Sequence, residues 1–110
     1  MNKILLMISL LLICVLAIAD KGDSPLIIDV RTTAEWDTGH LVDAKHIEWQ
    51  DISARISDIT TDKDETIYVY CRSGGRSEKA KTILDELGYI NVINAGGIAD
   101  AQVFINAQEN

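Results

Sequence analysis

Cysteine and proline are scarce in this chain, and acidic residues outnumber basic ones. The 110 residues include two cysteines, Cys14 and Cys71, and a single proline, Pro25. The formal net charge is −7 at pH 7, with 17 acidic residues against 10 lysines and arginines. The basic residues do not gather in a patch, so the charge argues against nucleic acid or an anionic membrane surface as a partner.

A hydrophobic run long enough to span a membrane is also missing. Residues 4–19 are uncharged and mostly apolar, but these 16 residues fall short of the roughly 20 that a membrane-spanning helix needs. Ala17 and Ala19 are small residues at both positions that a signal peptidase reads, and the chain turns polar after them. We therefore predict a cleaved signal peptide at residues 1–19 and a single domain at residues 20–110. We expect export to the bacterial periplasm, with no stable membrane anchor after cleavage.

Two alternatives for the N-terminal run remain open: an uncleaved anchor, and a lipoprotein signal that ends at Cys14. The second is disfavoured because bulky Ile13 stands where such a signal has a small residue. Cleavage after Ala19 would leave Cys71 as the one thiol of the mature chain, so no internal disulfide could form.

Strand and helix patterns alternate along the rest of the chain. Short β-branched and aromatic runs predict four strands, at residues 26–30, 46–49, 66–70 and 91–93. Helical patterns lie between them, at residues 33–38, 52–59 and 77–87. Gly88 is expected to end the last of these helices. The alternation predicts an α/β domain with a mostly parallel sheet flanked by helices.

The loop after the third expected strand carries the most informative residues, which are Cys71, Arg72, Ser73, Gly74, Gly75, Arg76 and Ser77. In open α/β sheets, ligands bind just beyond the carboxyl ends of strands, where Cys71 is placed. Gly74 and Gly75 allow successive backbone N–H groups to converge, and Ser77 can cap the following helix. Both features favour an anion site.

The same loop predicts a thiolate at Cys71. Positive potential from the helix N-terminus and from Arg72 or Arg76 favours the charged form, so we expect a pKa below the roughly 8.5 of a free thiol. A lone cysteine after an apolar strand is often only a small buried residue, and a glycine pair is often only a turn. Two arginines, two glycines and a possible helix cap within seven residues favour a nucleophile instead.

At this point the residues resemble those of the rhodanese family. The loop resembles the active-site loop of rhodanese-fold sulfurtransferases, and further family motifs follow in order: Ile28-Asp29-Val30-Arg31, Glu35-Trp36, Gly39-His40-Leu41, Gly88-Tyr89 and Asn94-Ala95-Gly96-Gly97. The resemblance covers about residues 25–100 and is greatest to small exported members with one domain. It implies a rhodanese-like three-layer fold.

The resemblance also implies a chemistry, thiosulfate:cyanide-type sulfur transfer without cofactor or metal. Cys71 would take the outer sulfur of thiosulfate, or of a low-molecular-weight persulfide, and hold it as a persulfide. A thiophilic acceptor such as cyanide or a thiol would then remove it. By match to the family loop, the backbone N–H groups of residues 72–77 would cradle the sulfur. Arg76, with Arg72 as a second candidate, would hold the anionic donor.

Two other functions remain open: a phosphatase or arsenate reductase on the same fold, and a non-catalytic sulfur-carrier or binding module. Cys71 and Arg76 stand in Cys-x4-Arg spacing. In the family this shorter loop accompanies sulfur transfer, whereas a phosphate-handling loop has one more residue.

Several polar residues outside the loop are expected to be structural. Asp29, Arg31 and Glu35 could form an acid–base set, but Asp-x-Arg at a strand end more often forms an ion pair that ties the strand to the next turn. His40 and His46 have no cysteine or third histidine nearby in sequence, so we expect no metal site there.

The chain departs from the family pattern in two places. Asp43 and Glu48 stand where the family usually has glycine and proline, so we expect an altered turn. The customary aromatic residue after Gly97 is also missing, and we expect the final helix to pack more loosely.

Overall fold

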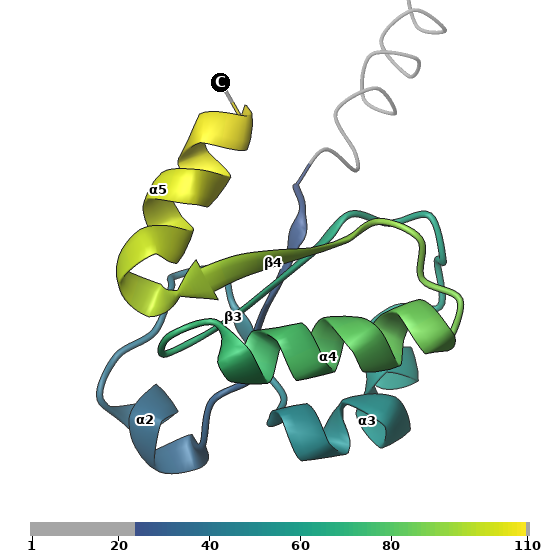
Figure 1. Cartoon of the computed structure of the whole chain (residues 1–110), viewed down its shortest axis with the longest axis horizontal. Helices are drawn as coiled ribbons and strands as arrows, with labels where there is room; N and C mark the ends of the chain where they lie inside the picture. The colour runs from purple at the N-terminus through teal and green to yellow at the C-terminus, as the bar shows by residue number, and fades with distance from the viewer. Residues whose placement is uncertain (1–23, 110) are drawn as a thin grey trace, which may run out of the picture.

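The structure of the chain is a computed structural model that describes residues 24–109 (Figure 1). The predicted signal peptide at residues 1–19 lies outside the described residues. Within residues 24–109, no helix combines the length and the apolar character that crossing a membrane requires.

A four-stranded sheet lies at the centre of the domain, and every pair of neighbouring strands in it runs parallel. In the spatial order β2-β1-β3-β4, its strands are β1 (Leu26–Asp29), β2 (Lys45–His46), β3 (Ile67–Cys71) and β4 (Val92–Gly97). β3 is buried along its whole length and β1 at all but its first residue, because helices cover both faces of the sheet. The predicted parallel sheet is confirmed.

The second and fourth strands differ in length from the prediction. β2 ends at His46, and a short 3-10 helix, η1 (Trp49–Asp51), begins where the strand was expected to end. The chain still follows β1 at this point, since the Trp49 N–H donates to the carbonyl oxygen of Val30 at 3.2 Å. β4 continues to Gly97, beyond its predicted end.

The backbone on both sides of β2 keeps ordinary geometry at Asp43 and Glu48, which stand where the family usually has glycine and proline. Glu48 has φ −58° and ψ 145°, an extended conformation that a proline would also adopt. Asp43 has no positive φ, because all positive φ angles among the described residues belong to glycines. Neither residue therefore has a backbone conformation that strains its side chain.

Helices cover both faces of the sheet. They are α2 (Thr33–Asp37), α3 (Ile52–Ile59), α4 (Gly75–Glu86) and α5 (Ile98–Glu109). α3 and α4 lie side by side on one face, while α5 lies on the other (Figure 1). The three layers predicted from the sequence are confirmed, and α3 has the predicted bounds.

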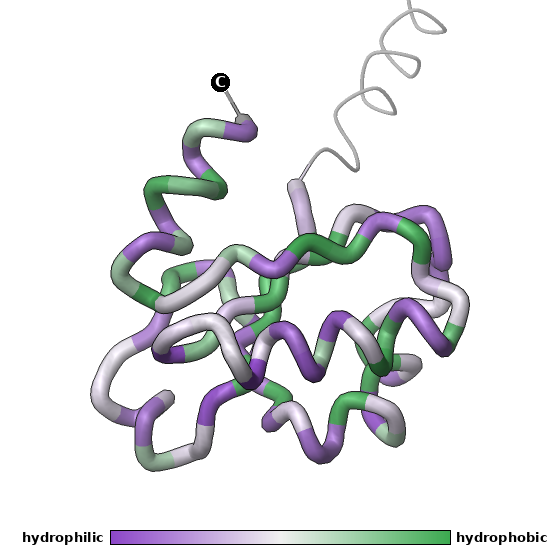
Figure 2. The backbone as a smooth tube through the Cα atoms, in the orientation of Figure 1, coloured by the Kyte–Doolittle hydropathy of each residue, from purple (hydrophilic) through white to green (hydrophobic). Residues whose placement is uncertain are grey.

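The core divides along β3 because successive side chains of a strand point to opposite faces. Ile67, Val69 and Cys71 pack in the cluster that includes α3 and α4, whereas Tyr68 and Tyr70 pack in the cluster that includes α5. Figure 2 shows hydrophobic residues along the sheet and an alternation with hydrophilic ones along α4. Although the customary aromatic residue after Gly97 is missing, α5 is anchored by two buried residues, Ala101 and Ile105.

Candidate active site

Cys71 is buried at the end of β3, where the loop to α4 begins. The residue is 1% exposed, and it is the one cysteine of the described residues. Its Sγ accepts a hydrogen bond from the Gly74 N–H at 2.9 Å and lies 3.3 Å from the hydroxyl oxygen of Ser77. The loop therefore folds back over the sulfur and directs polar hydrogens toward it.

α4 begins earlier than predicted, and its N-cap is Gly74 rather than Ser77. Gly74 has φ +103°, a conformation that side-chain-bearing residues rarely adopt, so the sharp entry into the helix depends on glycine. The prediction that Ser77 caps the helix is wrong, because the chain has already turned into the helix before it reaches Ser77. Instead, Ser77 is fully buried in the first turn, and its hydroxyl lies 3.0 Å from the Gly74 carbonyl oxygen.

The pKa of Cys71 is lowered from its ordinary value, in the predicted direction. Burial by itself raises the pKa of this thiol, because it disfavours the charged form. Hydrogen bonds from the Ser77 hydroxyl and from the backbone N–H groups of Ser77, Ser73 and Gly74 lower it by more. These hydrogen bonds, more than the arginine charges on which the sequence prediction relied, prepare the thiolate.

The lowered pKa predicts how fast Cys71 is alkylated at each pH. The thiolate reacts, so the rate constant with iodoacetamide should rise through an inflection below the roughly 8.5 of a free thiol. In Ser77→Ala the inflection should move to higher pH, because a donor to the sulfur is lost. Thr82→Ala is the control, since the Thr82 hydroxyl donates to the Glu78 carbonyl oxygen one turn further along α4. A wild-type inflection at or above 8.5 would contradict the prediction.

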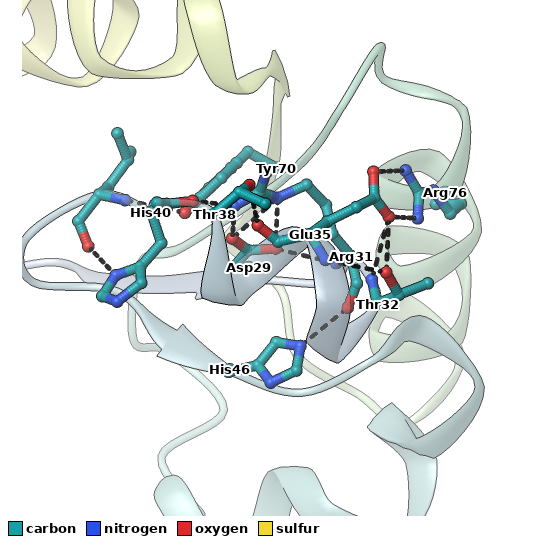
Figure 3. Close-up of polar contacts among 11 residues, drawn as sticks. Asp29, Arg31, Thr32, Glu35, Thr38, His40, His46, Tyr70 and Arg76 are labelled. Atoms are coloured by element: carbon teal, nitrogen blue, oxygen red, sulfur yellow. Dashed lines mark hydrogen bonds and ion pairs between the residues drawn. The ribbon is translucent and has the colours of Figure 1, made fainter.

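Arg76 does not point freely into solvent but forms a bidentate ion pair with Glu35 (Figure 3). The Nη1–Oε1 distance is 2.6 Å and the Nη2–Oε2 distance is 2.9 Å. The guanidinium group lowers the pKa of Glu35 to about 2, so this carboxylate stays charged at any ordinary pH. Arg76, which was expected to bind the anionic sulfur donor, is therefore already paired with a carboxylate of α2.

Glu35 also fixes the start of α2. Its Oε1 accepts hydrogen bonds from the Thr32 N–H at 3.2 Å and the Thr32 hydroxyl at 3.0 Å, while its own N–H donates to Thr32 Oγ1. This reciprocal pair is a capping box. A single carboxylate thus joins the N-terminus of α2 to the first turn of α4, a structural role as predicted.

Asp29 and Arg31 form the predicted ion pair, and both are buried. Arg31 Nη2 lies 2.7 Å from Asp29 Oδ2, with further hydrogen bonds from the Arg31 Nε and backbone N–H to the same carboxylate. Arg31 Nη2 also donates to the carbonyl oxygen of Gly39 at 2.7 Å. The expectation that the pair ties β1 to the following turn is confirmed.

The two histidines pack against Trp36. The His40 ring stacks on Trp36 with centroids 3.4 Å apart, and the His46 ring stacks with centroids 4.9 Å apart. His40 Nδ1 lies 2.9 Å from the Leu41 carbonyl oxygen, and His46 Nε2 lies 2.8 Å from the Arg31 carbonyl oxygen. A carbonyl only accepts, so these ring nitrogens carry hydrogen and act as donors.

The last residues of β4 pack closely against the loop that follows Cys71. The sequence did not predict this role. Gly97 pairs with Cys71, next to a register shift in β3. A Cβ atom at Gly97 would overlap the carbonyl oxygen of Arg72 and lie 3.4 Å from Cα of Ser73. The Asn94 side chain also reaches the loop, with its Oδ1 2.7 Å from the Ser77 hydroxyl oxygen.

An open pocket of about 450 Å³ lies beside the loop, lined by Arg31, Ala34, Glu35, Thr38, Arg72 and Ile98. Arg72 is exposed there, and no salt bridge of residues 24–109 includes it. The pocket therefore combines a cation without a carboxylate partner, Arg72, with Glu35, the carboxylate that is paired with Arg76.

Comparison with known proteins places the chain in a family. A family model described as a rhodanese-like domain matches residues 14–102. The chain belongs to the rhodanese-like domain family. Among curated proteins, thiosulfate sulfurtransferase PspE of Escherichia coli K12 is 41% identical over 73 residues, which cover 66% of this chain and 70% of that protein. A sulfurtransferase of Allochromatium vinosum is 40% identical over 80 residues, which cover 73% of this chain and 72% of that protein.

The rhodanese-like fold is shared with solved structures. A structure titled as a rhodanese with anions from E. coli superposes with a TM-score of 0.68 and 39% identity, covering 70% of this chain and 91% of that one. In this rhodanese-like site, Cys71, Gly74 and Ser77 come together around the sulfur. Of the other predicted residues, Ser73 and Gly75 are exposed, Arg72 lines the pocket, and Arg76 is paired.

Proposed function

We propose that this rhodanese-like protein is a thiosulfate sulfurtransferase in which Cys71 carries the sulfur as a persulfide. The Cys71 thiolate attacks the outer sulfur of thiosulfate, a new S–S bond forms, and the S–S bond of thiosulfate breaks with its electron pair on the departing sulfite. Cyanide or a thiol then attacks the outer sulfur of the persulfide, and Sγ leaves as a thiolate. The observation that carries the proposal is the set of hydrogen-bond donors around Sγ.

Two further findings support this chemistry. The relatives described above are named as a thiosulfate sulfurtransferase and a sulfurtransferase. The site also stabilises the Cys71 thiolate at both stages of the cycle. The same hydrogen-bond donors stabilise it when it attacks thiosulfate and when it leaves from the persulfide. The loop backbone of residues 72–77 is proposed to cradle the transferred sulfur.

Thiocyanate formation from thiosulfate and cyanide tests the proposal. The wild-type protein should form thiocyanate and, with thiosulfate alone, gain the mass of one sulfur on Cys71. Cys71→Ser should do neither. Equal thiocyanate from both proteins would contradict the mechanism, and turnover of p-nitrophenyl phosphate without thiocyanate would favour a phosphatase. A stable mass gain with no turnover would indicate a sulfur carrier.

Arg72 is proposed as the residue that first attracts the anionic donor, with Arg76 acting from its pair with Glu35. Because Arg72 lines the pocket without a carboxylate partner, Arg72→Ala should raise the KM for thiosulfate roughly tenfold, which corresponds to about 1.4 kcal/mol. Arg76→Ala should change the KM less, because the charge of Glu35 offsets that of Arg76. Steady-state kinetics at one ionic strength measures both.

The control for this comparison is Arg55→Ala. Arg55 is exposed on α3, outside the pocket, and its loss changes the net charge by the same amount. An equal rise of KM in Arg55→Ala and Arg72→Ala would mean that overall charge, and not the position of Arg72, attracts the donor.

Export to the periplasm is proposed from the sequence alone. Residues 1–19 would be removed as a signal peptide, leaving residues 20–110 as the mature domain. The N-terminal sequence of the protein recovered from a periplasmic extract should then begin at Asp20. A protein that begins at Met1 and stays with the membrane fraction would favour an uncleaved anchor.

A further inference from the structure

The side chain of Asn94 connects β4 to the first turn of α4. Its Oδ1 lies 2.7 Å from the Ser77 hydroxyl oxygen and accepts from the Gly96 N–H at 2.9 Å. Its Nδ2 donates to the Gly74 carbonyl oxygen at 3.1 Å and to a carboxylate oxygen of Glu78 at 3.0 Å. Asn94 thus contacts the neighbours of Cys71 without contacting the sulfur.

The partners of Asn94 fix the orientation of its amide. The Gly96 N–H can only donate, so the atom that it meets must be the oxygen. The Gly74 carbonyl and the Glu78 carboxylate can only accept, so the atom between them must be the NH₂ group. The oxygen that faces Ser77 is therefore an acceptor, and the hydroxyl donates to it.

The hydroxyl of Ser77 has one hydrogen and three acceptors within reach. These are Asn94 Oδ1 at 2.7 Å, the Gly74 carbonyl oxygen at 3.0 Å and Cys71 Sγ at 3.3 Å. Both oxygen acceptors have other donors: the Gly96 N–H donates to Asn94 Oδ1, while Asn94 Nδ2 and the Glu78 N–H donate to the Gly74 carbonyl oxygen. The hydroxyl hydrogen can therefore turn to the sulfur without leaving either of these half-buried oxygens unsatisfied.

We propose that Asn94 is a positioning residue for sulfur transfer, which holds the Ser77 hydroxyl beside Cys71 and accepts its hydrogen whenever the sulfur is uncharged. The inference rests on the proposed function. With a Cys71 thiol, the S–H donates to Ser77 Oγ and the hydroxyl donates to Asn94. After the thiol proton passes to water, the hydroxyl turns and donates to the thiolate.

The same turn accompanies each half of the reaction. When Sγ forms its bond to the incoming sulfur it loses its negative charge, and the hydroxyl hydrogen returns to Asn94 Oδ1. When the acceptor removes the outer sulfur, Sγ regains the electron pair of the broken S–S bond, and the hydroxyl donates to it again. The hydrogen stays on Ser77 throughout, so no proton has to enter or leave for the sulfur to be stabilised.

The pH profile of Cys71 alkylation tests this role. In Asn94→Leu the Ser77 hydroxyl loses the amide that holds it beside the sulfur, and the Gly74 carbonyl, left with the Glu78 N–H as its other donor, competes more strongly for the hydroxyl hydrogen. The inflection should then rise by roughly one pH unit, the effect of losing a hydrogen bond to a charged group. In the Ser77→Ala background, Asn94→Leu should produce little further shift, because its effect passes through the missing hydroxyl. A full additional shift in that background would overturn the proposal, as would an unchanged profile in the single variant.

Two further variants keep the test decisive. Asn91→Leu removes an asparagine that donates to the Asp64 carbonyl oxygen, outside the loop, and should leave the profile unchanged. Asn94→Asp retains the acceptor for Gly96 and Ser77, so it remains informative if Asn94→Leu does not fold. Its added charge raises the inflection with or without Ser77, but the rise should be larger with Ser77 present. Equal rises in both backgrounds would contradict the proposal.

Thiocyanate assays run in parallel separate this inference from the proposed function. Alkylation requires no sulfur donor, so the profile reports on Asn94 whether or not the protein transfers sulfur. Absence of thiocyanate from the wild-type protein would contradict the proposed function. Additive alkylation shifts would contradict the role of Asn94 alone.

Discussion

Replacing Gly97 with alanine is expected to abolish most sulfur transfer and to lower the melting temperature. The added Cβ would overlap the Arg72 carbonyl oxygen and lie 3.1 Å from the carbonyl carbon of the same residue. These atoms are backbone and cannot swing aside as a flexible side chain would. Because Gly97 pairs with Cys71, relieving the overlap must move the loop that surrounds the sulfur.

The expected destabilisation is that of an overpacked site, roughly 1–3 kcal/mol. For a domain of this size each kcal/mol lowers the melting temperature by roughly 4–8 °C. Gly75→Ala is the matched control for stability. A Cβ atom at Gly75 meets nothing within 4 Å, and this residue begins α4, where alanine is the better helix former. Thermal unfolding that leaves both variants as stable as the wild type would contradict the explanation.

Asp29→Ala is expected to destabilise the domain by about 3–5 kcal/mol, because it leaves the Arg31 guanidinium buried without its carboxylate. Asp29 is fully buried and Arg31 is 4% exposed. The variant also removes the acceptor of the Arg31 backbone N–H, 2.9 Å away at the end of β1. Urea denaturation measures the change in the free energy of unfolding.

The matched control is Asp85→Ala, which breaks an ion pair of the same length on the surface. The Lys81–Asp85 and Arg31–Asp29 pairs both have N–O distances of 2.7 Å, but the Lys81 and Asp85 side chains are 32% and 44% exposed. Solvent screening should limit the loss at Asp85 to about 0.5 kcal/mol. Equal losses in the two variants would mean that burial does not set the strength of the Asp29–Arg31 interaction.

Patterns of neighbouring residues were sufficient to predict most of the fold. The β-branched runs that form β1 and β3 can only be buried on both faces, and a parallel sheet with helices on each side satisfies this requirement. The spacing of apolar residues gave the bounds of α3. The ion pair of Asp29 with Arg31 was predictable because the two residues are only two positions apart in the sequence.

The partners within the site could not be predicted in the same way. Arg76 and Glu35 are 41 residues apart, and Ser77 and Asn94 are 17 apart. Their contacts arise only when α2 and β4 pack beside the start of α4. The sequence therefore did not predict a carboxylate partner for Arg76. It placed Asn94 in a family motif but predicted no contact for its side chain. The capping role of Ser77 failed for a local reason, since nothing in the sequence told which glycine would begin the helix.

The edges of the sheet bear on whether this protein aggregates. Unpaired edge strands can add strands from other molecules, and long, flat, apolar edges are the most dangerous. One edge here is β2, which has two residues, Lys45 and His46, and the other is β4, whose last four residues are Asn94, Ala95, Gly96 and Gly97. The first is too short and too polar to template a new strand, and the second is rich in residues with poor strand propensity. The glycines that make room for the loop thus also protect the domain from edge-to-edge association.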